Sequence, residues 1–208
     1  MKIEQPKIKE LISHDILESY NELDFTNYVY SKNITKQITI EDIYFDSCKF
    51  DKIDFDNIEL KNIDLYDVIF EECDLSNKSF DNRMLSRVVF KDCKLVGTTF
   101  IDASLKDVSF INCKIIYSNF SNNKINKMII SDSDLTETTF LECDIKNIEL
   151  ENNKCDKTEF LQTKLTNVDF STCDISNTIF DNYSLKGIVV DRFQCDSLVH
   201  MLGVNIKQ

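Results

Sequence analysis

The sequence predicts an all-β solenoid, in which the chain winds into stacked turns of short extended sides. Large apolar residues stand at every fifth position from Ile40 to Val190, except at 155, where Cys155 takes the central position. This period fits neither a helix, which repeats every 3.6 residues, nor a strand, which repeats every two. A smaller residue precedes each large one by two places, so both can point inward from one extended side. No insertion breaks the row, and a period this short is typical of solenoids.

The segment before the row is predicted to cover the open end of the solenoid, which would otherwise expose unpaired backbone and apolar side chains. After Pro6, four apolar residues keep helical spacing and predict a short amphipathic helix within residues 7–20. The five-residue row first shows at Phe25 but is interrupted near Asn33, so residues 22–37 are expected to form an irregular first turn or part of the cover. The four apolar residues are Ile8, Leu11, Ile12 and Ile16. We therefore assign residues 1–37 to the N-terminal cap and first turn.

Residues 38–190 are assigned to the regular repeat. Two exceptions to its small inner positions, Lys78 and Arg83, predict a local bulge around residues 76–84, because a charge cannot be buried there without a partner. Asn123 and Asn153 are milder exceptions, since a short amide can bond to turn backbone. Six cysteines occupy inner positions as small hydrophobes, which favours reduced thiols and a cytoplasmic location. These are Cys48, Cys73, Cys93, Cys113, Cys143 and Cys173.

The repeat resembles the pentapeptide-repeat family, whose pattern is a small residue, a polar residue, Leu or Phe and two polar residues. The segment CDLSN at 73–77 matches it closely. The resemblance implies a right-handed quadrilateral parallel β-helix with twenty residues per turn. Residues twenty apart then stack, which predicts one phenylalanine column through Phe50, Phe70, Phe90 and Phe110. A second column is predicted at Phe80, Phe100, Phe120, Phe140, Phe160 and Phe180.

The outward positions divide unevenly by charge among the four sides. With a formal net charge of −12, the chain is unsuited to direct contact with nucleic acid or anionic membrane. The first acidic face, centred on residues 80 and 100, includes Asp81, Asp102 and Glu142. The second acidic face, centred on residues 70 and 90, includes Glu71, Glu72, Asp92, Asp132 and Glu151. The lysine face, centred on residues 85 and 105, includes Arg87, Lys106, Lys124, Lys127, Lys146, Lys164 and Lys186.

The last segment, residues 191–208, is predicted to form a C-terminal helix and tail. Asp191 suits the N-cap of a helix of about three turns, and Gly203 suits its end. Residues 187–206, GIVVDRFQCDSLVHMLGVNI, resemble the C-terminal module of the Qnr family of quinolone-resistance proteins. That resemblance implies a capping helix that also joins a homodimer. The expected interface residues are Leu198, Val199, Leu202, Val204 and Ile206.

Qnr-type proteins are understood to imitate duplex DNA and bind type II topoisomerases, so the resemblance implies DNA gyrase or topoisomerase IV as a partner. Many Qnr proteins project loops toward gyrase, whereas this chain keeps its register. A rod that binds another, unidentified partner is therefore kept as an alternative. An enzyme is not expected, because the two histidines lie far apart in sequence and neither a nucleophile motif nor a Gly-rich loop occurs. No cofactor, metal or membrane segment is expected either.

Overall fold

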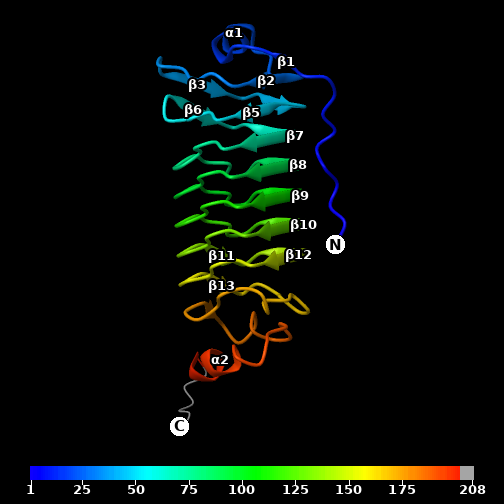
Figure 1. Cartoon of the computed structure of the whole chain (residues 1–208), viewed down its shortest axis with the longest axis vertical. Coiled ribbons are helices and arrows are strands. Elements are labelled where there is room, and N and C mark those ends of the chain that lie inside the picture. The colour runs from blue at the N-terminus through cyan, green and yellow to red at the C-terminus, as the bar shows by residue number, and fades with distance from the viewer. Residues whose placement is uncertain (202–208) are drawn as a thin grey trace.

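The computed structural model describes residues 1–201, except for the side chains of residues 197, 200 and 201. It is an all-β parallel solenoid with one short helix near each end (Figure 1). Strands pair in parallel with the strand of the next turn, and partners lie twenty residues apart, as Leu85 pairs with Leu105 and Phe90 with Phe110. The predicted solenoid and its twenty-residue turn are confirmed. No helix in the described part of the chain has the length and apolar character needed to cross a bilayer.

The strands fall into three parallel sheets. The largest has the order β1-β2-β5-β7-β8-β9-β10-β12, with β4 also paired to β7; the others are β11-β13-β14 and β3-β6. Its members are β1 (Ile12–Ser13), β2 (Tyr28–Tyr30), β4 (Tyr44–Asp46), β5 (Lys49–Asp51), β7 (Asp64–Glu71), β8 (Met84–Lys91), β9 (Ser104–Ile111), β10 (Lys124–Ser131) and β12 (Asp144–Glu151). The smaller sheets comprise β3 (Ile38–Glu41), β6 (Ile58–Lys61), β11 (Thr139–Leu141), β13 (Glu159–Leu161) and β14 (Ile179–Phe180).

The core consists of the predicted columns of large residues. Phe70, Phe90 and Phe110 stack with ring centroids 5.1 and 4.9 Å apart and nearly parallel planes. Phe100 and Phe120 of the other column stack at 4.7 Å. The two columns meet edge to face, the arrangement that the charge distribution of aromatic rings favours. Stacking along each column and edge contacts between them therefore fill the centre of the solenoid.

The small inner residues add hydrogen bonds to backbone carbonyls of the preceding turn, some of which also accept from a backbone N–H group, as Leu75 O does from Lys78 N at 3.2 Å. Thr98 Oγ1 donates to Leu75 O at 2.9 Å, and Cys93 Sγ lies 3.4 Å from Phe70 O. The inner cysteines are free and buried, as expected from their positions. Asn153 uses both ends of its amide, accepting from Ser133 N and donating to Ile130 O. A hydroxyl, thiol or amide at these positions thus replaces a hydrogen bond to water.

Lys78 and Arg83 do not produce the expected bulge. The turn that carries them pairs normally with the following turn, since Phe80 N donates to Thr99 O at 2.8 Å and the twenty-residue register is kept. Toward the preceding turn, among the described residues, β6 pairs only with β3. Both long side chains are half-buried rather than inside the core. The charged groups are therefore accommodated at a break in pairing between two turns, without an extra residue.

The N-terminal helix begins later than the sequence predicts. Helix α1 spans Ile16–Glu22, and Asp15 caps it with a side chain that accepts from Leu17 N at 2.8 Å. Asp15 has extended backbone angles, so the helix starts only at the residue after it. The residues before it form β1 and an extended segment, residues 1–11, along the side of the solenoid (Figure 1). The helical spacing of Ile8, Leu11 and Ile12 was therefore misleading, because the chain is extended there: Ile8 and Leu11 are half-buried, whereas Ile12 is 66% exposed in β1.

The C-terminal helix begins later than expected. Helix α2 spans Cys195–Met201, preceded by a turn in which Asp191 Oδ1 accepts from Phe193 N and Gln194 N. Gln194 Oε1 accepts from Asp191 N, and Gln194 Nε2 donates to the carbonyls of residues 170 and 173 at 2.9 and 2.7 Å. Asp191 and Gln194 thus form a capping box that is anchored to the last turns of the solenoid.

Candidate interaction faces

The first acidic face is the less compensated of the two. Asp81 Oδ1 accepts from Ile101 N at 2.7 Å, so it lies beside Asp102 of the next turn. Asp102 and Glu142 are exposed, and among the described residues neither carboxylate has a hydrogen bond or an ion pair. Two turns separate Asp102 from Glu142, a rise of about 10 Å at the spacing of neighbouring strands. This face therefore presents free negative charge along the solenoid.

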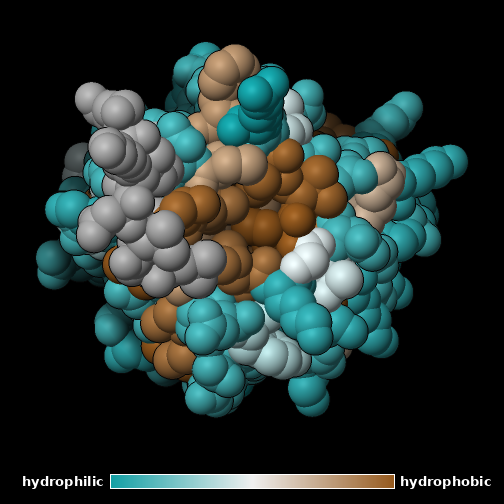
Figure 2. All heavy atoms as spheres, turned by 90° about the horizontal axis from the view of Figure 1, so that it is seen from below, coloured by the Kyte–Doolittle hydropathy of each residue, from teal (hydrophilic) through white to brown (hydrophobic). Residues whose placement is uncertain are grey.

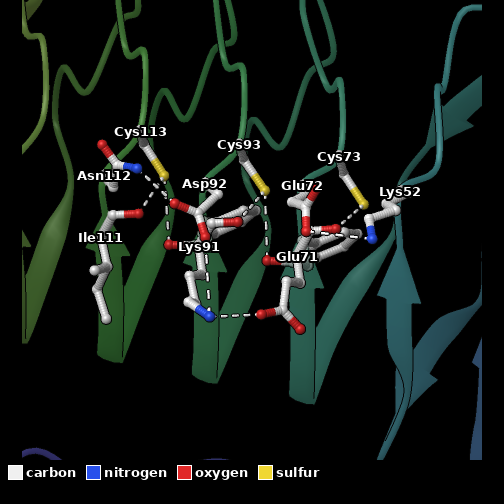
Figure 3. A network of polar contacts seen from close by, with 12 residues as sticks. Lys52, Glu71, Glu72, Cys73, Lys91, Asp92, Cys93, Ile111, Asn112 and Cys113 are labelled. Carbon is white, nitrogen blue, oxygen red and sulfur yellow. Dashed lines mark hydrogen bonds and ion pairs between the residues drawn. The ribbon is translucent and has the colours of Figure 1, made fainter.

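The second acidic face is largely neutralised by lysines of adjacent turns. Glu71 lies between Lys49 and Lys91, each with its Nζ 2.6 Å from a different carboxylate oxygen; Figure 3 shows the pair with Lys91. These two hydrogen bonds lower the pKa of Glu71 to about 2, well below its ordinary value. Glu72 has an ion pair with Lys52 at 3.5 Å. The twenty-residue turn brings each of these opposite charges into contact, so the Glu71 and Glu72 carboxylates offer little net charge to a partner.

Two of the remaining predicted residues of the second face, Asp92 and Asp132, lie in one column of turn positions. Asp92 and Asp132 have positive φ, near 56° and 52°, a conformation that Asp and Asn tolerate better than most residues. Each accepts from the asparagine one turn later, Asn112 at 2.5 Å and Asn152 at 3.2 Å. Glu151 is exposed beside Asn152. Amide hydrogen bonds thus order the Asp92 and Asp132 carboxylates, and Lys91 Nζ also lies 3.9 Å from Asp92.

The lysine face holds an arrangement that the sequence reasoning missed. Asp67 and Asp107 are buried, and Arg87 lies in the same column of turn positions between them. Arg87 forms a two-pronged ion pair with Asp67, with both N···O distances at 2.6 Å. The N-terminal segment lies over this face and bonds to both aspartates. From the sequence, the lysine face was expected to be exposed. Only the fold shows that residues 1–11 lie on it.

The predicted dimer residues are only partly described. Leu198 and Val199 are half-buried, and Leu198 packs against the core of its own chain. Leu202, Val204 and Ile206 lie outside the described residues. Figure 2 shows apolar side chains gathered at this end of the molecule. Phe193, which the sequence reasoning passed over, is 90% exposed in the turn before α2, the highest exposure of any large apolar residue that the structure describes.

The residues described in the structure do not include a group of three or more His, Cys, Asp or Glu side chains placed to hold a metal ion. Burial raises the pKa of the Cys48 and Cys143 thiols to about 11. Such thiols stay protonated near neutral pH and are poor nucleophiles. The chemistry on the surface is therefore that of charged and hydrogen-bonding faces.

The comparisons with known proteins agree with this geometry. A family model described as "Pentapeptide repeat region" matches residues 63–140, and one described as "Pentapeptide repeats (8 copies)" matches residues 143–182, together more than half of the chain. The chain belongs to the pentapeptide-repeat family. The search of curated proteins found no match.

Among solved structures, this pentapeptide-repeat protein is similar to full-length QnrB1, a plasmid-mediated fluoroquinolone resistance protein. The TM-score is 0.52 at 19% identity, over 86% of this chain and 89% of that one. HetL, a protein involved in heterocyst differentiation regulation from the cyanobacterium Nostoc sp. strain PCC 7120, is 11% identical. It has a TM-score of 0.36 over 84% of this chain and 95% of HetL. At these identities, the likeness to QnrB1 shows the shared fold.

Proposed function

We propose that this pentapeptide-repeat protein is a non-enzymatic, DNA-mimicking rod that binds DNA gyrase or topoisomerase IV through its first acidic face. The observation that carries the proposal is the free charge of Asp102, which lies beside Asp81, and of Glu142 two turns further along. Half-buried Ile101 and Leu141 are their neighbours in sequence and add apolar contact area. A basic groove that accepts duplex DNA would meet repeated carboxylates at a fixed rise. The likeness to QnrB1 supports the fold needed for this role.

Under this proposal the turns form a right-handed, four-sided coil whose faces stay in line along the solenoid. Helices α1 and α2 cap its two ends. A homodimer joined at the C-terminal end would double the length of the acidic face. Phe193 is the residue we expect to carry the contact, because an aromatic ring 90% exposed at that end gains most from burial against a second copy.

A gyrase supercoiling and binding assay, with and without a quinolone, tests the proposal. We expect the double variant Asp102→Asn, Glu142→Gln to bind roughly three- to tenfold more weakly, since exposed charges contribute up to about 1 kcal/mol each. The matched control is Glu137→Gln with Asp144→Asn, which removes the same charge from other faces. No gyrase binding by the unaltered protein at micromolar concentration, or equal losses in the two double variants, would contradict the proposed partner or face.

Sedimentation tests the dimer separately. We expect Phe193→Asp to convert a dimer into a monomer while the circular dichroism of the solenoid stays unchanged. Leu198→Asp is less suitable, because Leu198 also packs on the core of its own chain. A protein that sediments as a monomer without any substitution would show that this end does not join two copies.

The alternative function is an interaction or scaffold protein for another cytoplasmic partner. The compensated second acidic face favours it, since ordered ion pairs such as Lys49–Glu71–Lys91 recognise a partner by the position of charges rather than by total charge. Binding that persists in high salt and ignores the Asp102 and Glu142 substitutions would favour this alternative over DNA mimicry.

A further inference from the structure

The N-terminal segment is seated on the lysine face as an extended peptide. Residues 1–11 run along the side of the solenoid beside the strands of the largest sheet (Figure 1). Lys7 N donates to Asp67 Oδ1 at 2.7 Å, and Glu4 N donates to Asp107 Oδ1 at 2.9 Å. The Met1 amine has an ion pair with Glu149 further along. The segment is thus held through main-chain N–H groups, which every non-proline residue carries.

The spacing of these bonds matches the rise of the solenoid. Three residues separate Lys7 from Glu4, and two turns separate Asp67 from Asp107. Two turns rise by about 9.6 Å at the strand spacing. Three residues cover about 9.9 Å in a strand and about 9.3 Å in a polyproline II helix. An extended chain can therefore meet every second turn with every third N–H group and keep its register over the whole length.

Between residues 3 and 7 the side chains follow the same period, from which the half-buried Ile8 departs. Ile3 and Pro6, each one residue before a bonded N–H group, are half-buried, whereas Glu4 and Lys7 are exposed. The surface thus fits an extended peptide in which the apolar residue of a three-residue repeat faces inward. Proline suits this repeat because its missing N–H group falls between the bonded positions.

The two acceptors are built into the turns. The Asp107 side chain is 2% exposed, with Lys127 Nζ 3.8 Å away. The Asp67 side chain is 10% exposed and is held by Arg87, whose hydrogen bonds also lower the pKa of Asp67. Carboxylates held in this way have little side-chain freedom left to lose when they accept a hydrogen bond from an N–H group.

The same face continues beyond the segment. At Met1 the segment reaches a groove of about 660 Å³, whose apolar lining includes Ile145, Ile148, Leu150 and Val168. Ile148, Leu150 and Val168 are buried, so they form a floor rather than projecting outward. The surface that takes an extended chain is therefore longer than the part that residues 1–11 cover.

We propose that this surface is a binding track for extended peptides, and that residues 1–11 occupy it as a ligand from the same chain. A partner that fits is an extended segment of another protein with an apolar residue or proline at every third position, each followed by a residue with a free N–H group. It competes with residues 1–11 for Asp67 and Asp107. The track lies on a different face from the carboxylates of the proposed DNA mimic and does not depend on that function.

The test uses the protein without residues 1–10 and a fluorescent peptide with the sequence of residues 1–11, acetylated at its amine. We expect micromolar binding by anisotropy, and at least tenfold weaker binding by the full-length protein, whose own segment competes. A peptide methylated on the nitrogens of Glu4 and Lys7 keeps its side chains but loses both donors, and should bind at least tenfold more weakly. Equal binding of the two peptides, or none to the shortened protein, overturns the proposal.

A pair of variants locates the site. Asp107→Gly removes the acceptor while glycine accommodates the positive φ near 53°. Asp102→Gly makes the same change, at φ near 56°, on the first acidic face. We expect the first to abolish peptide binding and the second to leave it unchanged; equal effects overturn the assignment.

Hydrogen exchange of the full-length protein answers the question even if the shortened chain fails to fold. The amides of Glu4 and Lys7 should exchange at least tenfold more slowly than that of Gln5, and Asp107→Gly should release Glu4. Equal exchange at the three residues overturns the proposal.

Discussion

Replacing Phe100 by leucine tests how much the phenylalanine columns contribute to the fold. Phe100 is fully buried in the middle of its column. Its ring stacks on Phe80 at 5.4 Å and on Phe120 at 4.7 Å, and it meets Phe90 and Phe110 edge to face at 6.3 and 5.9 Å. Leucine is common at equivalent positions, so the backbone can keep its conformation while all four aromatic contacts are lost.

The expected cost is about 2–3 kcal/mol. Aromatic pairs contribute roughly 0.5–1.5 kcal/mol each beyond the area they bury, and four pairs around one ring are not additive. The smaller side chain also leaves part of the ring volume unfilled, which adds a cavity cost. Phe180 provides the matched control. It lies at the end of the column, is only half-buried and makes two ring contacts, so Phe180→Leu should cost about 1 kcal/mol.

Chemical unfolding in guanidinium chloride, followed by far-ultraviolet circular dichroism, measures both variants. A solenoid is stabilised by contacts between neighbouring turns, so a weak central turn lowers the stability of the turns on both sides, whereas a weak terminal turn frays alone. Phe100→Leu should therefore shift the main transition, and Phe180→Leu mainly its early part. Equal shifts for the two variants, or a cost below about 1 kcal/mol for Phe100→Leu, would refute the argument from ring stacking.

Three further predictions concern single polar groups. The pKa of Glu71 is lowered from 4.5 to about 2, so its contribution to stability is complete above pH 4.5 and is lost as the pH falls toward 2. Urea unfolding at a series of pH values should show a loss of about 1 kcal/mol over this range. Glu71→Gln should abolish this dependence on pH. The Asn123 Nδ2 atom is buried without a hydrogen-bond partner, so Asn123→Ser should stabilise the protein by about 1 kcal/mol in thermal unfolding. Asn153→Ser is the control: it loses an amide that has its hydrogen bonds, so it should destabilise the protein in that assay. Of the eight cysteines, only Cys195 is exposed, so a thiol reagent should modify one group in the native protein and eight after denaturation; rapid modification of several native thiols would show that the inner column opens.

The amino-acid sequence was sufficient for the repeat because its period concerns local geometry. An inward residue at every fifth place follows from how far one extended side turns, and stacking of Phe90 on Phe110 follows once a turn has twenty residues. That small residues occupy the inner positions was also predictable. The cysteine, threonine and serine side chains there each contact a backbone carbonyl of the preceding turn. Lys78 and Arg83 were correctly seen as misfits, but the response of the backbone was not predictable. Either a bulge in the chain or a break in the strand pairing between two turns can accommodate a charged side chain at an inner position.

The sequence alone determined the solenoid, its register and its core, and it placed the carboxylates along the sides. The tertiary structure decided which carboxylates remain free, because an ion pair such as Lys91–Glu71 depends on side-chain reach between turns. It also decided the path of residues 1–11. Their anchors are main-chain N–H groups, which are chemically the same at every non-proline residue, so the side chains of Glu4 and Lys7 do not themselves mark these residues as donors. The match between three extended residues and two turns exists only when the turns are stacked.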